Sequence, residues 1–254
     1  MWPFSKSQHV TASGILCEMT DYHSHILPGV DDGVKTMDES LQILAEMKRQ
    51  GVRKVWFTPH IMEDIPNTNA ELKERFQELK EKFRKPEDSY CGTVELNLAA
   101  EYMMDNLFTE RLESDDLLPI YEGGCRYLLV ETTGFTPPMN LLPVLKRIQT
   151  KGYRPLLAHP ERYLYMGASY YCMLKQERVA FQLNLPSLTG AYGTYIQKKA
   201  VSLLKAGMYD LTGTDVHSLE HFKEWLGTRI GSRDRDMLSA RFQKWENEIS
   251  QPLE

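Results

Sequence analysis

The sequence predicts an α/β protein in which parallel strands alternate with helices and close, or nearly close, into a barrel. Seven short β-rich runs alternate with longer helical runs along the 254 residues, and this alternation favours a parallel sheet with helical crossovers. No low-complexity tract or break in composition divides the chain, and barrels of this length commonly form one domain. Metal-ligand side chains also follow six of the seven predicted strands, where a barrel would gather them at one face.

Seven strands are expected from short runs of β-branched, aromatic and aliphatic residues. The runs are residues 19–23, 54–58, 94–100, 127–131, 155–158, 180–183 and 209–213. Seven repeats of the strand–helix unit favour a closed or nearly closed barrel over an open sheet. We therefore expect an α/β fold with a (β/α)7 arrangement.

The expected helices begin at capping residues and end near glycines. Thr36-Met-Asp-Glu39 has the pattern of a capping box, which predicts a helix that runs to Gln50 and is stopped by Gly51. Asn69 is expected to cap a helix over residues 70–83. Further helices are expected over residues 140–151, 192–206 and 234–250.

Composition excludes some classes of function. We expect residues 1–254 to form a single domain, with an N-terminal extension at 1–18 and a C-terminal helix within 228–254. The formal net charge is −5, which argues against a nucleic-acid partner, since such proteins usually carry a basic patch.

Cysteine usage and hydropathy indicate the compartment. The four cysteines, Cys17, Cys91, Cys125 and Cys172, form no CxxC pair, so neither a zinc ribbon nor a disulfide framework is expected. No run approaches the roughly 18–20 apolar residues of a membrane helix, and the N-terminus lacks the apolar run of a signal peptide. The sequence therefore predicts no transmembrane segment and a reducing, cytoplasmic setting.

Five histidines and four carboxylates lie where predicted strands end. They are His23, His25, Asp32, His60, Glu101, Glu131, His159, Asp215 and His217. Residues two apart in an extended segment share a face, so both His-x-His and Asp-x-His can point into one pocket. Each element alone has an ordinary structural explanation, such as a hydrogen-bonded histidine or a helix cap. Their joint occurrence predicts a multinuclear metal site and metal-assisted hydrolysis.

The residue types also constrain the metal. Imidazole and carboxylate ligands without thiolate suit Mn²⁺, Fe²⁺ or Zn²⁺. Nine ligands exceed the needs of one ion, so we expect two or three divalent ions with one carboxylate shared between two of them.

Several of these segments resemble a known family. DYHSHILPGVDDG, TPH, AAE, VET, AHPER and GTDVH resemble the ordered motifs of the polymerase-and-histidinol-phosphatase (PHP) superfamily. Within it they are most similar to the bacterial metal-dependent protein-tyrosine phosphatases of capsule and exopolysaccharide operons. The resemblance covers residues 21–217. It implies a distorted (β/α)7 barrel of PHP type and a trinuclear site, most simply of Mn²⁺.

The resemblance also implies a ligand set for each ion. One ion would be held by His23, His25, Glu101 and Asp215, a second by Glu101, Glu131 and His159, and a third by Asp32, His60 and His217. The implied activity is hydrolysis of phosphotyrosine on a protein, namely a tyrosine-autophosphorylating kinase that controls polysaccharide export. Glu101 and Asp215 would then act in catalysis through the ions that they hold.

The resemblance implies that Arg162, in the AHPER motif, binds phosphate, and a guanidinium can hold two phosphate oxygens. The alternative is a surface salt bridge with Glu161. Related phosphatases often carry a second arginine shortly after the final Asp-x-His motif, and here that stretch has none before Arg229. His221 or Lys223 would have to replace it.

Four aromatic residues follow ligand positions closely and are candidates for the mouth of the site. They are Tyr102, Phe135, Tyr163 and Tyr165. They could accept an aromatic ring or simply pack at the rim of the barrel, and the sequence leaves both interpretations open.

Other functions remain in view. A small-molecule phosphomonoesterase of the histidinol-phosphatase type would use the same ligands, and so would a catalytically silent metal-binding regulator. The C-x5-R spacing of Cys172 and Arg178 matches cysteine-dependent phosphatases. That segment has no glycine and has a helical pattern, so we do not expect it to form a phosphate-binding loop. The oligomeric state is not predicted.

Overall fold

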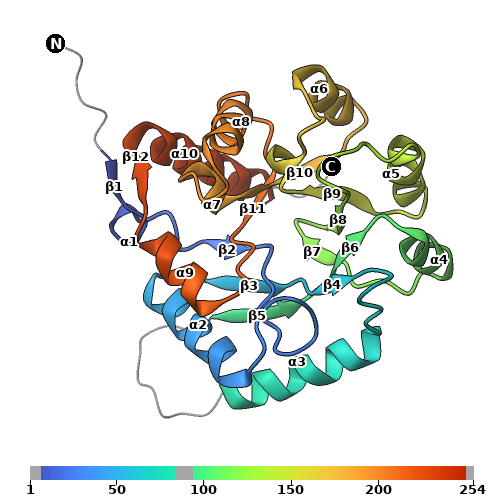
Figure 1. Ribbon diagram of the computed structural model, residues 1–254, viewed down its shortest axis with the longest axis horizontal. Coiled ribbons are helices and arrows are strands. Elements are labelled where there is room, and N and C mark those ends of the chain that lie inside the picture. Colours follow the sequence, from blue (N-terminus) through green and yellow to red (C-terminus); the bar gives the residue numbers. More distant parts are fainter. Residues whose placement is uncertain (1–6, 84–93, 250–254) are drawn as a thin grey trace.

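The computed structural model describes residues 7–83 and 94–249, with side chains up to Arg241. Its helices surround a curled, mainly parallel sheet (Figure 1), which confirms the expected mixed α/β fold. Each expected strand is present, with shifted ends. The seven are β2 (Thr20–Asp21), β3 (Lys54–Phe57), β5 (Glu95–Leu98), β8 (Cys125–Glu131), β9 (Arg154–Ala158), β10 (Ala180–Asn184) and β11 (Leu211–Gly213).

Strand pairing follows the order of the chain. One path runs β2–β3–β5 and another runs β4–β6–β8–β9–β10–β11, with parallel pairing throughout both. β4 (His60–Ile61) and β6 (Glu101–Met103) follow β3 and β5 after short breaks. Pro59 lies in the first break and has no N–H to donate to a ladder. The expected strands at 54–58 and 94–100 are therefore each followed by a second short strand, and His60 and Glu101 begin those strands.

The first and last of these strands are joined just beyond their ends. The N–H of Asp215 donates to the carbonyl of His23 at 2.8 Å, and the N–H of His25 donates to the carbonyl of Val216 at 2.9 Å. Gly213 makes this approach possible, because a Cβ atom there would lie 2.9 Å from the backbone nitrogen of His23. The curl of the sheet thus brings residues 23–25 beside residues 213–217.

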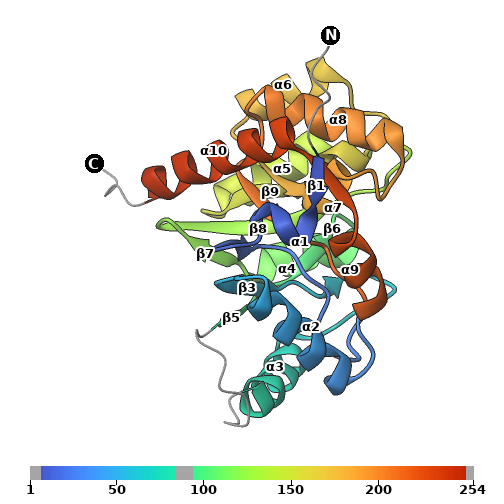
Figure 2. The same cartoon turned by 90° about the vertical axis from the view of Figure 1, so that its left-hand side faces the viewer.

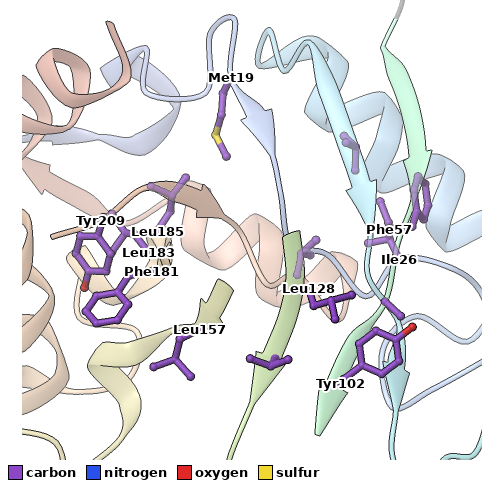
Figure 3. Packing of buried hydrophobic residues seen from close by; sticks show 14 of the residues in the cluster. Met19, Ile26, Phe57, Tyr102, Leu128, Leu157, Phe181, Leu183, Leu185 and Tyr209 are labelled. Carbon is purple, nitrogen blue, oxygen red and sulfur yellow. The ribbon is translucent and has the colours of Figure 1, made fainter. Parts of the chain in front are cut away.

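The sheet is buried on both faces. In β8 and β9, Leu128, Val130 and Leu157 belong to a large apolar cluster, whereas Leu129 and Leu156 belong to a smaller one. Figure 3 shows part of the large cluster, including Leu128 and Leu157, packed between strands and helices. Alternate side chains of one strand therefore serve separate cores, as expected for parallel strands covered on both sides.

The first long helix confirms one half of the expected capping box. In α2 (Met37–Arg49), the hydroxyl of Thr36 accepts a hydrogen bond from the N–H of Glu39 at 3.2 Å. The carboxylate of Glu39 does not return to Thr36 and instead accepts from the N–H of Leu219 at 3.0 Å. It thus fixes the start of α9 (Leu219–Leu226), a helix that the sequence analysis did not predict.

The expected cap at Asn69 is wrong by one residue. Asn69 is the first residue of α3 (Asn69–Phe83), and its side chain donates to Asp116 at 2.6 Å. Thr68 and Glu71 form the capping box, since each side chain accepts a hydrogen bond from the other's N–H, at 3.3 and 3.1 Å. Two adjacent polar residues offered a cap, and the tertiary contact with Asp116 engages the second of them.

The remaining helices lie close to their expected positions or are new. α5 (Leu141–Thr150), α8 (Thr194–Lys205) and α10 (Ser232–Ile249) match predicted helices within a few residues. α6 (Ala168–Gln176) contains Cys172, as the helical pattern there indicated. The short elements α1 (Val10–Ser13), α4 (Asn106–Ser114), α7 (Leu185–Leu188), the antiparallel strand β7 (Ile120–Glu122) and a 3₁₀ turn at Pro160–Arg162 were not predicted.

The N-terminal segment is tied to the C-terminal part of the chain. β1 (Ser7–His9) pairs with β12 (Arg229–Gly231) in an antiparallel ribbon, visible beside α10 in Figure 1. Val10 and Leu16 are buried in the main core. The expected extension at 1–18 is therefore packed from Ser7 onward, and the expected C-terminal region 228–254 begins with a strand. Figure 2 shows the far end of α10 projecting from the rest of the chain.

Within residues 7–83 and 94–249, no helix has the length and apolar character needed to cross a membrane.

Substituting Gly213 tests the contact between the ends of β2 and β11. Gly213→Ala places a methyl group against the backbone of His23, so we expect a loss of about 1–3 kcal/mol in the free energy of unfolding. Urea denaturation measures the change. Gly134→Ala is the matched control, because nothing lies within 4 Å of a Cβ atom there. Equal effects of the two substitutions would contradict the close approach.

Candidate metal centre

The nine sequence-predicted ligands converge from seven segments of the chain. His23 and His25 follow β2, His60 opens β4, Glu101 opens β6, Glu131 ends β8, His159 follows β9, and Asp215 and His217 follow β11. Asp32 comes from the glycine-containing loop before α2. The carboxyl ends of parallel strands meet at one edge of a sheet, and this geometry gathers the side chains into three overlapping groups.

The first group surrounds a carboxylate oxygen of Glu101. The Nε2 atoms of His23 and His25 lie 3.0 Å apart, and each lies 3.2 Å from Oε2 of Glu101. Oδ1 of Asp215 lies 3.4 Å from His23 Nε2 and 3.5 Å from His25 Nε2. The structure therefore brings together all four residues expected for one ion.

The second group lies on the other side of Glu101. Its Oε1 atom is 3.3 Å from Nε2 of His159, and Glu131 Oε2 is 3.8 Å from the same nitrogen. Nδ1 of His60 also approaches this group, at 3.2 Å from Glu101 Oε2 and 3.3 Å from Glu131 Oε1. Glu101 thus lies between two clusters, as expected of a shared carboxylate. His60 is an additional neighbour of the second cluster.

The third group lies at the solvent edge. Oδ1 of Asp32 is 3.6 Å from Nε2 of His60 and 3.6 Å from Nε2 of His217. The His25 ring stacks on that of His217, with 4.0 Å between the centroids. The side chain of Asp32 is 64% exposed, whereas that of Glu101 is 1% exposed. This group is therefore the most accessible of the three.

Unsatisfied buried atoms fit a cation-binding role. Among the described residues, neither carboxylate oxygen of Glu101 has a hydrogen-bond donor, and Nδ1 of His60 and His159 also lack hydrogen-bond partners. Buried polar atoms are nearly always paired in folded proteins. Oxygen and imidazole donors of this kind suit divalent cations such as Mn²⁺, Fe²⁺ and Zn²⁺, so the residues present fit such ions.

The pKa shifts of Glu101 and Glu131 also fit a cation-binding role. Burial alone would raise the pKa of Glu101, but His23 and His60 hold it well below its usual value. Burial and the charge of Glu101 raise the pKa of Glu131 well above its usual value. A cation between the two carboxylates would relieve this repulsion.

One imidazole is held neutral by its surroundings. Burial, and then the positive charge of Arg162, lower the pKa of His159 to about 4. A neutral imidazole is the form that binds a metal, so His159 presents a free lone pair at ordinary pH.

Two residues that the sequence analysis did not select orient the histidines. Asp31 Oδ2 lies 2.8 Å from Nδ1 of His25, and Gln182 Oε1 lies 3.0 Å from Nδ1 of His23. Each acceptor places the ring proton on Nδ1 and leaves Nε2 facing Glu101. Asp31 adjoins Asp32 in the sequence and carried a weak signal, whereas Gln182 lies inside a strand and carried none.

Strained backbone occurs at two ligand positions. His159 has φ of 34° and Asp215 has φ of 53°, in the left-handed region that non-glycine residues rarely adopt. Such strain persists only where the surroundings impose it, and it clusters at functional sites. At both positions the chain has just left a strand.

Arg162 contacts the first group directly. Its Nη1 atom donates to Oδ2 of Asp215 at 2.7 Å, and its guanidinium carbon lies 4.8 Å from the centroid of the Tyr192 ring. The alternative salt bridge with Glu161 is wrong. Glu161 is fully buried and accepts from the N–H of Asn184 and the hydroxyl of Tyr209, each at 3.0 Å.

A pocket of about 610 Å³ opens beside the first and third groups. Ligand pockets commonly enclose roughly 300–1,000 Å³. Its lining combines the guanidinium, ligand side chains and a set of apolar and aromatic residues. The lining residues are Arg162, Pro186, Ala191, Tyr192, Thr214, Asp215, Val216, His217, His221, Phe222, Glu224, Trp225 and Thr228.

The aromatic residues proposed for the mouth of the site do not line this pocket. Tyr102 and Tyr163 are buried in the core, where their hydroxyls accept from the N–H groups of Leu118 and Thr132. Tyr165 is half-buried and Phe135 is exposed, outside the pocket lining. The sequence showed that these aromatics follow ligand-bearing strands but did not show which way each side chain points.

Two residues considered as replacements for a second arginine differ in position. His221 lines the pocket and Lys223 does not, because α9 presents different faces at these two positions. The alternative cysteine nucleophile is not supported either. Cys172 lies within α6, so its surroundings are helical and do not form a phosphate-binding loop.

Metal content tests the shared role of Glu101. Glu101→Ala removes the carboxylate that faces both buried groups, so we expect it to lower the bound metal per chain, measured by elemental analysis after dialysis against Mn²⁺. Asp32→Ala is the control at the exposed edge and should retain more metal. Undiminished metal in Glu101→Ala would show that Glu101 does not bridge.

The pH dependence of stability tests the buried state of Glu161. Burial raises its pKa from 4.5 to about 7. The folded chain keeps this proton up to about pH 7 while the unfolded chain releases it near pH 4.5. Stability from this group is therefore greatest below pH 4.5, falls as the pH rises to 7, and is level above. The expected fall is about 3 kcal/mol.

Urea denaturation from pH 4.5 to 8 measures this effect. Glu161→Gln should flatten the fall in stability, whereas Glu110→Gln, at an exposed position, should keep the wild-type slope. A wild-type slope in Glu161→Gln would mean that Glu161 is already ionised in the folded protein at low pH.

Comparison with known proteins agrees with this geometry. The profile of the family described as "Capsular polysaccharide synthesis, CpsB/CapC" matches residues 19–228. A Staphylococcus aureus protein named "Putative tyrosine-protein phosphatase CapC" is 28% identical over 206 residues, covering 79% of this chain and 78% of its own. Streptococcus pneumoniae "Tyrosine-protein phosphatase CpsB" is 28% identical over 216 residues, covering 80% and 84%.

A solved structure is similar over almost the whole chain. It belongs to work on YwqE from Bacillus subtilis and CpsB from Streptococcus pneumoniae, described as "unique metal-dependent tyrosine phosphatases". It has a TM-score of 0.75 and 22% identity, and covers 93% of this chain and 96% of that one. This similarity concerns the fold. The family match spans well over half of the sequence, and the chain belongs to the CpsB/CapC family of capsular polysaccharide synthesis proteins.

Proposed function

We propose that this protein is a metal-dependent protein-tyrosine phosphatase, a phosphoric monoester hydrolase that acts on phosphotyrosine in a protein. The observation that carries the proposal is the convergence of a cationic guanidinium and a cluster of metal-ligand side chains on one pocket. The relatives' names point to the same activity. By the resemblance of the motifs, the substrate is a bacterial tyrosine kinase that autophosphorylates and controls capsule or exopolysaccharide export.

For the fold we propose a distorted (β/α)7 barrel of PHP type. The backbone hydrogen bonds that join residues 23–25 to residues 215–216 support closure of the sheet. The similarity to the YwqE and CpsB structures supports the same arrangement.

For the cofactor we propose two or three divalent ions, Mn²⁺ before Fe²⁺ or Zn²⁺. The ligand sets are His23, His25, Glu101 and Asp215 for one ion, Glu101, Glu131 and His159 for a second, and Asp32, His60 and His217 for a third. His60 has one ring nitrogen toward each of the last two groups, and an ordinary neutral imidazole offers one lone pair. Binding by one nitrogen therefore leaves the other protonated.

Bound divalent cations in such a site stabilise negative charge on a phosphoryl group and lower the pKa of water toward neutrality. The chain's own contribution is positioning and charge, because phosphoryl transfer needs little covalent help from the protein. The guanidinium of Arg162 uses Nη1 for Asp215, and its other guanidinium N–H groups make no hydrogen bond to any described residue. Those N–H groups are available for phosphate oxygens, in the geometry that guanidinium and phosphate favour.

The pocket provides for the leaving group. Tyr192, Phe222 and Trp225 line it together with Pro186 and Val216, and such apolar and aromatic walls suit a phenol ring. A tyrosyl phenolate has a pKa near 10, so it leaves more readily than an alkoxide. Both properties favour aryl phosphates over alkyl phosphates. His221, which lines the same pocket as Arg162, offers a further ring nitrogen.

Turnover assays test the activity and its alternatives. With Mn²⁺ present, we expect hydrolysis of a phosphotyrosine peptide at much higher kcat/KM than that of a phosphoserine peptide or histidinol phosphate. Chelation should abolish turnover and added Mn²⁺ should restore it. Faster turnover of histidinol phosphate would identify a small-molecule phosphomonoesterase, and no turnover of any of these esters would indicate a non-catalytic metal-binding protein.

The role of Arg162 has its own test. Arg162→Ala should lower kcat/KM for the phosphotyrosine peptide by about 10²–10³-fold, the usual cost of removing one donor to a developing charge, while bound metal stays at the wild-type level. Arg178→Ala, outside the pocket lining, is the control. Unchanged kinetics in Arg162→Ala would exclude it from phosphate binding.

A further inference from the structure

Arg162 belongs to a network of four side chains whose contacts form a closed loop. Its Nη1 donates to Asp215 Oδ2 at 2.7 Å. The side-chain Nδ2 of Asn184 donates to the same oxygen at 3.0 Å and to the hydroxyl of Tyr192 at 3.2 Å. The ring of Tyr192 lies against the guanidinium, 4.8 Å from its carbon to the centroid. The contacts therefore run from Arg162 to Asp215, Asn184, Tyr192 and back.

Asp215 divides its two oxygens between two tasks. Oδ1 faces His23 and His25, whereas Oδ2 accepts from Arg162 and Asn184. The four-residue network is therefore attached to the candidate metal centre through the carboxylate of Asp215. The remaining guanidinium N–H groups of Arg162 face away from that contact.

The side chains of the four-residue network are fixed to different degrees. Asn184 is fully buried at the end of β10. Its backbone N–H donates to the buried carboxylate of Glu161. Tyr192 is 40% exposed and lies between α7 and α8, in a turn closed by the hydrogen bond from the N–H of Gly193 to the carbonyl of Gly190. Arg162 is 36% exposed. Asn184 is thus a rigid anchor for two partly exposed side chains.

A partly exposed arginine loses rotamer entropy when a ligand immobilises it. Contact with Asp215 alone fixes one edge of the guanidinium and leaves the plane free to tilt. An aromatic face against that plane adds a cation–π attraction. The two contacts together set both the position and the tilt of the plane before any ligand arrives.

We propose that Tyr192, anchored through its hydroxyl by Asn184, is a positioning residue that holds the guanidinium of Arg162 in the orientation that binds the phosphoryl group. The proposal rests on the proposed function for the identity of that ligand. Tyr192 acts through Arg162, and its aromatic ring carries the effect, while its hydroxyl sets where the ring stands.

Two substitutions at Tyr192 distinguish the effect of its aromatic ring from that of its hydroxyl. Tyr192→Leu removes the aromatic face and should lower kcat/KM for p-nitrophenyl phosphate, measured with Mn²⁺, about tenfold. Tyr192→Phe keeps the face but loses the hydrogen bond from Asn184 to the hydroxyl, so its kcat/KM should fall between those of wild type and Tyr192→Leu. Tyr195→Leu is the matched control, because Tyr195 is exposed on α8 and does not line the pocket. Circular dichroism and thermal unfolding show whether each variant folds.

A double-mutant cycle tests whether Tyr192 works through Arg162. If it does, Tyr192→Leu causes no further loss in an Arg162→Ala background, because coupled residues are non-additive. Full additivity of the two losses would overturn the proposal and would mean that Tyr192 contacts the substrate's ring itself. Wild-type kinetics in Tyr192→Leu would overturn it as well.

A readout without turnover keeps this inference separate from the proposed function. The NMR signals of the Arg162 guanidinium are assigned by their loss in Arg162→Lys. They report the rate of rotation about the bonds from Cζ to the terminal nitrogens. Rotation should be slowest in wild type, intermediate in Tyr192→Phe and fastest in Tyr192→Leu. Failure of wild type to hydrolyse any phosphate ester would refute the phosphatase function but leave this measurement valid. Equal rotation rates in all three proteins would refute the positioning role.

Discussion

The contact between the ends of β2 and β11 is the constraint on which the rest of the centre depends. Asp21 is fully buried and accepts from the N–H of His23 and from both the N–H and the hydroxyl of Thr214. With the bond from the N–H of Asp215 to the carbonyl of His23, it joins the two ends of the curled sheet. The His-x-His segment at residues 23–25 and the Asp-x-His segment at residues 215–217 can share a site only because this junction forms.

Glu101 is the electrostatic centre of the arrangement that follows. Its buried carboxylate lies 3.2–3.3 Å from ring nitrogens of four histidines, His23, His25, His60 and His159. Burying a carboxylate costs several kcal/mol unless opposite charge compensates it. Here His23 and His60 lower the pKa of Glu101 and so supply part of this compensation. These residues are far apart in sequence and become neighbours where parallel strands end. Around them, Asp31 and Gln182 fix the ring orientations of His25 and His23, so the ligand set is organised beyond the residues that face the centre.

The pocket lies beside the first and third groups of candidate ligands. The turn between α7 and α8 and the helix α9 form the walls, and Arg162 and Tyr192 stand where these walls meet the candidate ligands. Glu39 accepts from the N–H of Leu219, and β1 pairs with β12 just after α9. Segments near the N-terminus therefore hold the helix that lines the pocket, which links regions without catalytic residues to the shape of the site.

Much of this protein was predictable from local sequence patterns. Hydrophobic runs such as 127–131 and 180–183 predicted the strands, and Thr36 with Glu39 predicted a helix start, because such patterns express backbone preferences over a few residues. All nine predicted ligands lie in one cluster, since their positions at strand ends imply convergence once the sheet is parallel. Pro59 marks the break between β3 and β4 in the sequence, whereas the break between β5 and β6 was not predictable, because hydrogen-bond partners on other strands determine it.

The sequence by itself determined the order of strands and helices and the chemical nature of the centre. Tertiary structure decided which partners those residues meet: Thr68 rather than Asn69 caps α3, Asp215 rather than Glu161 pairs with Arg162, and Tyr192 rather than Tyr102 or Tyr163 stands at the pocket. The physical reason is that side-chain direction at a strand end depends on backbone angles and on contacts across the fold. Residues separated by tens of positions in sequence supply those contacts, and no local pattern records them.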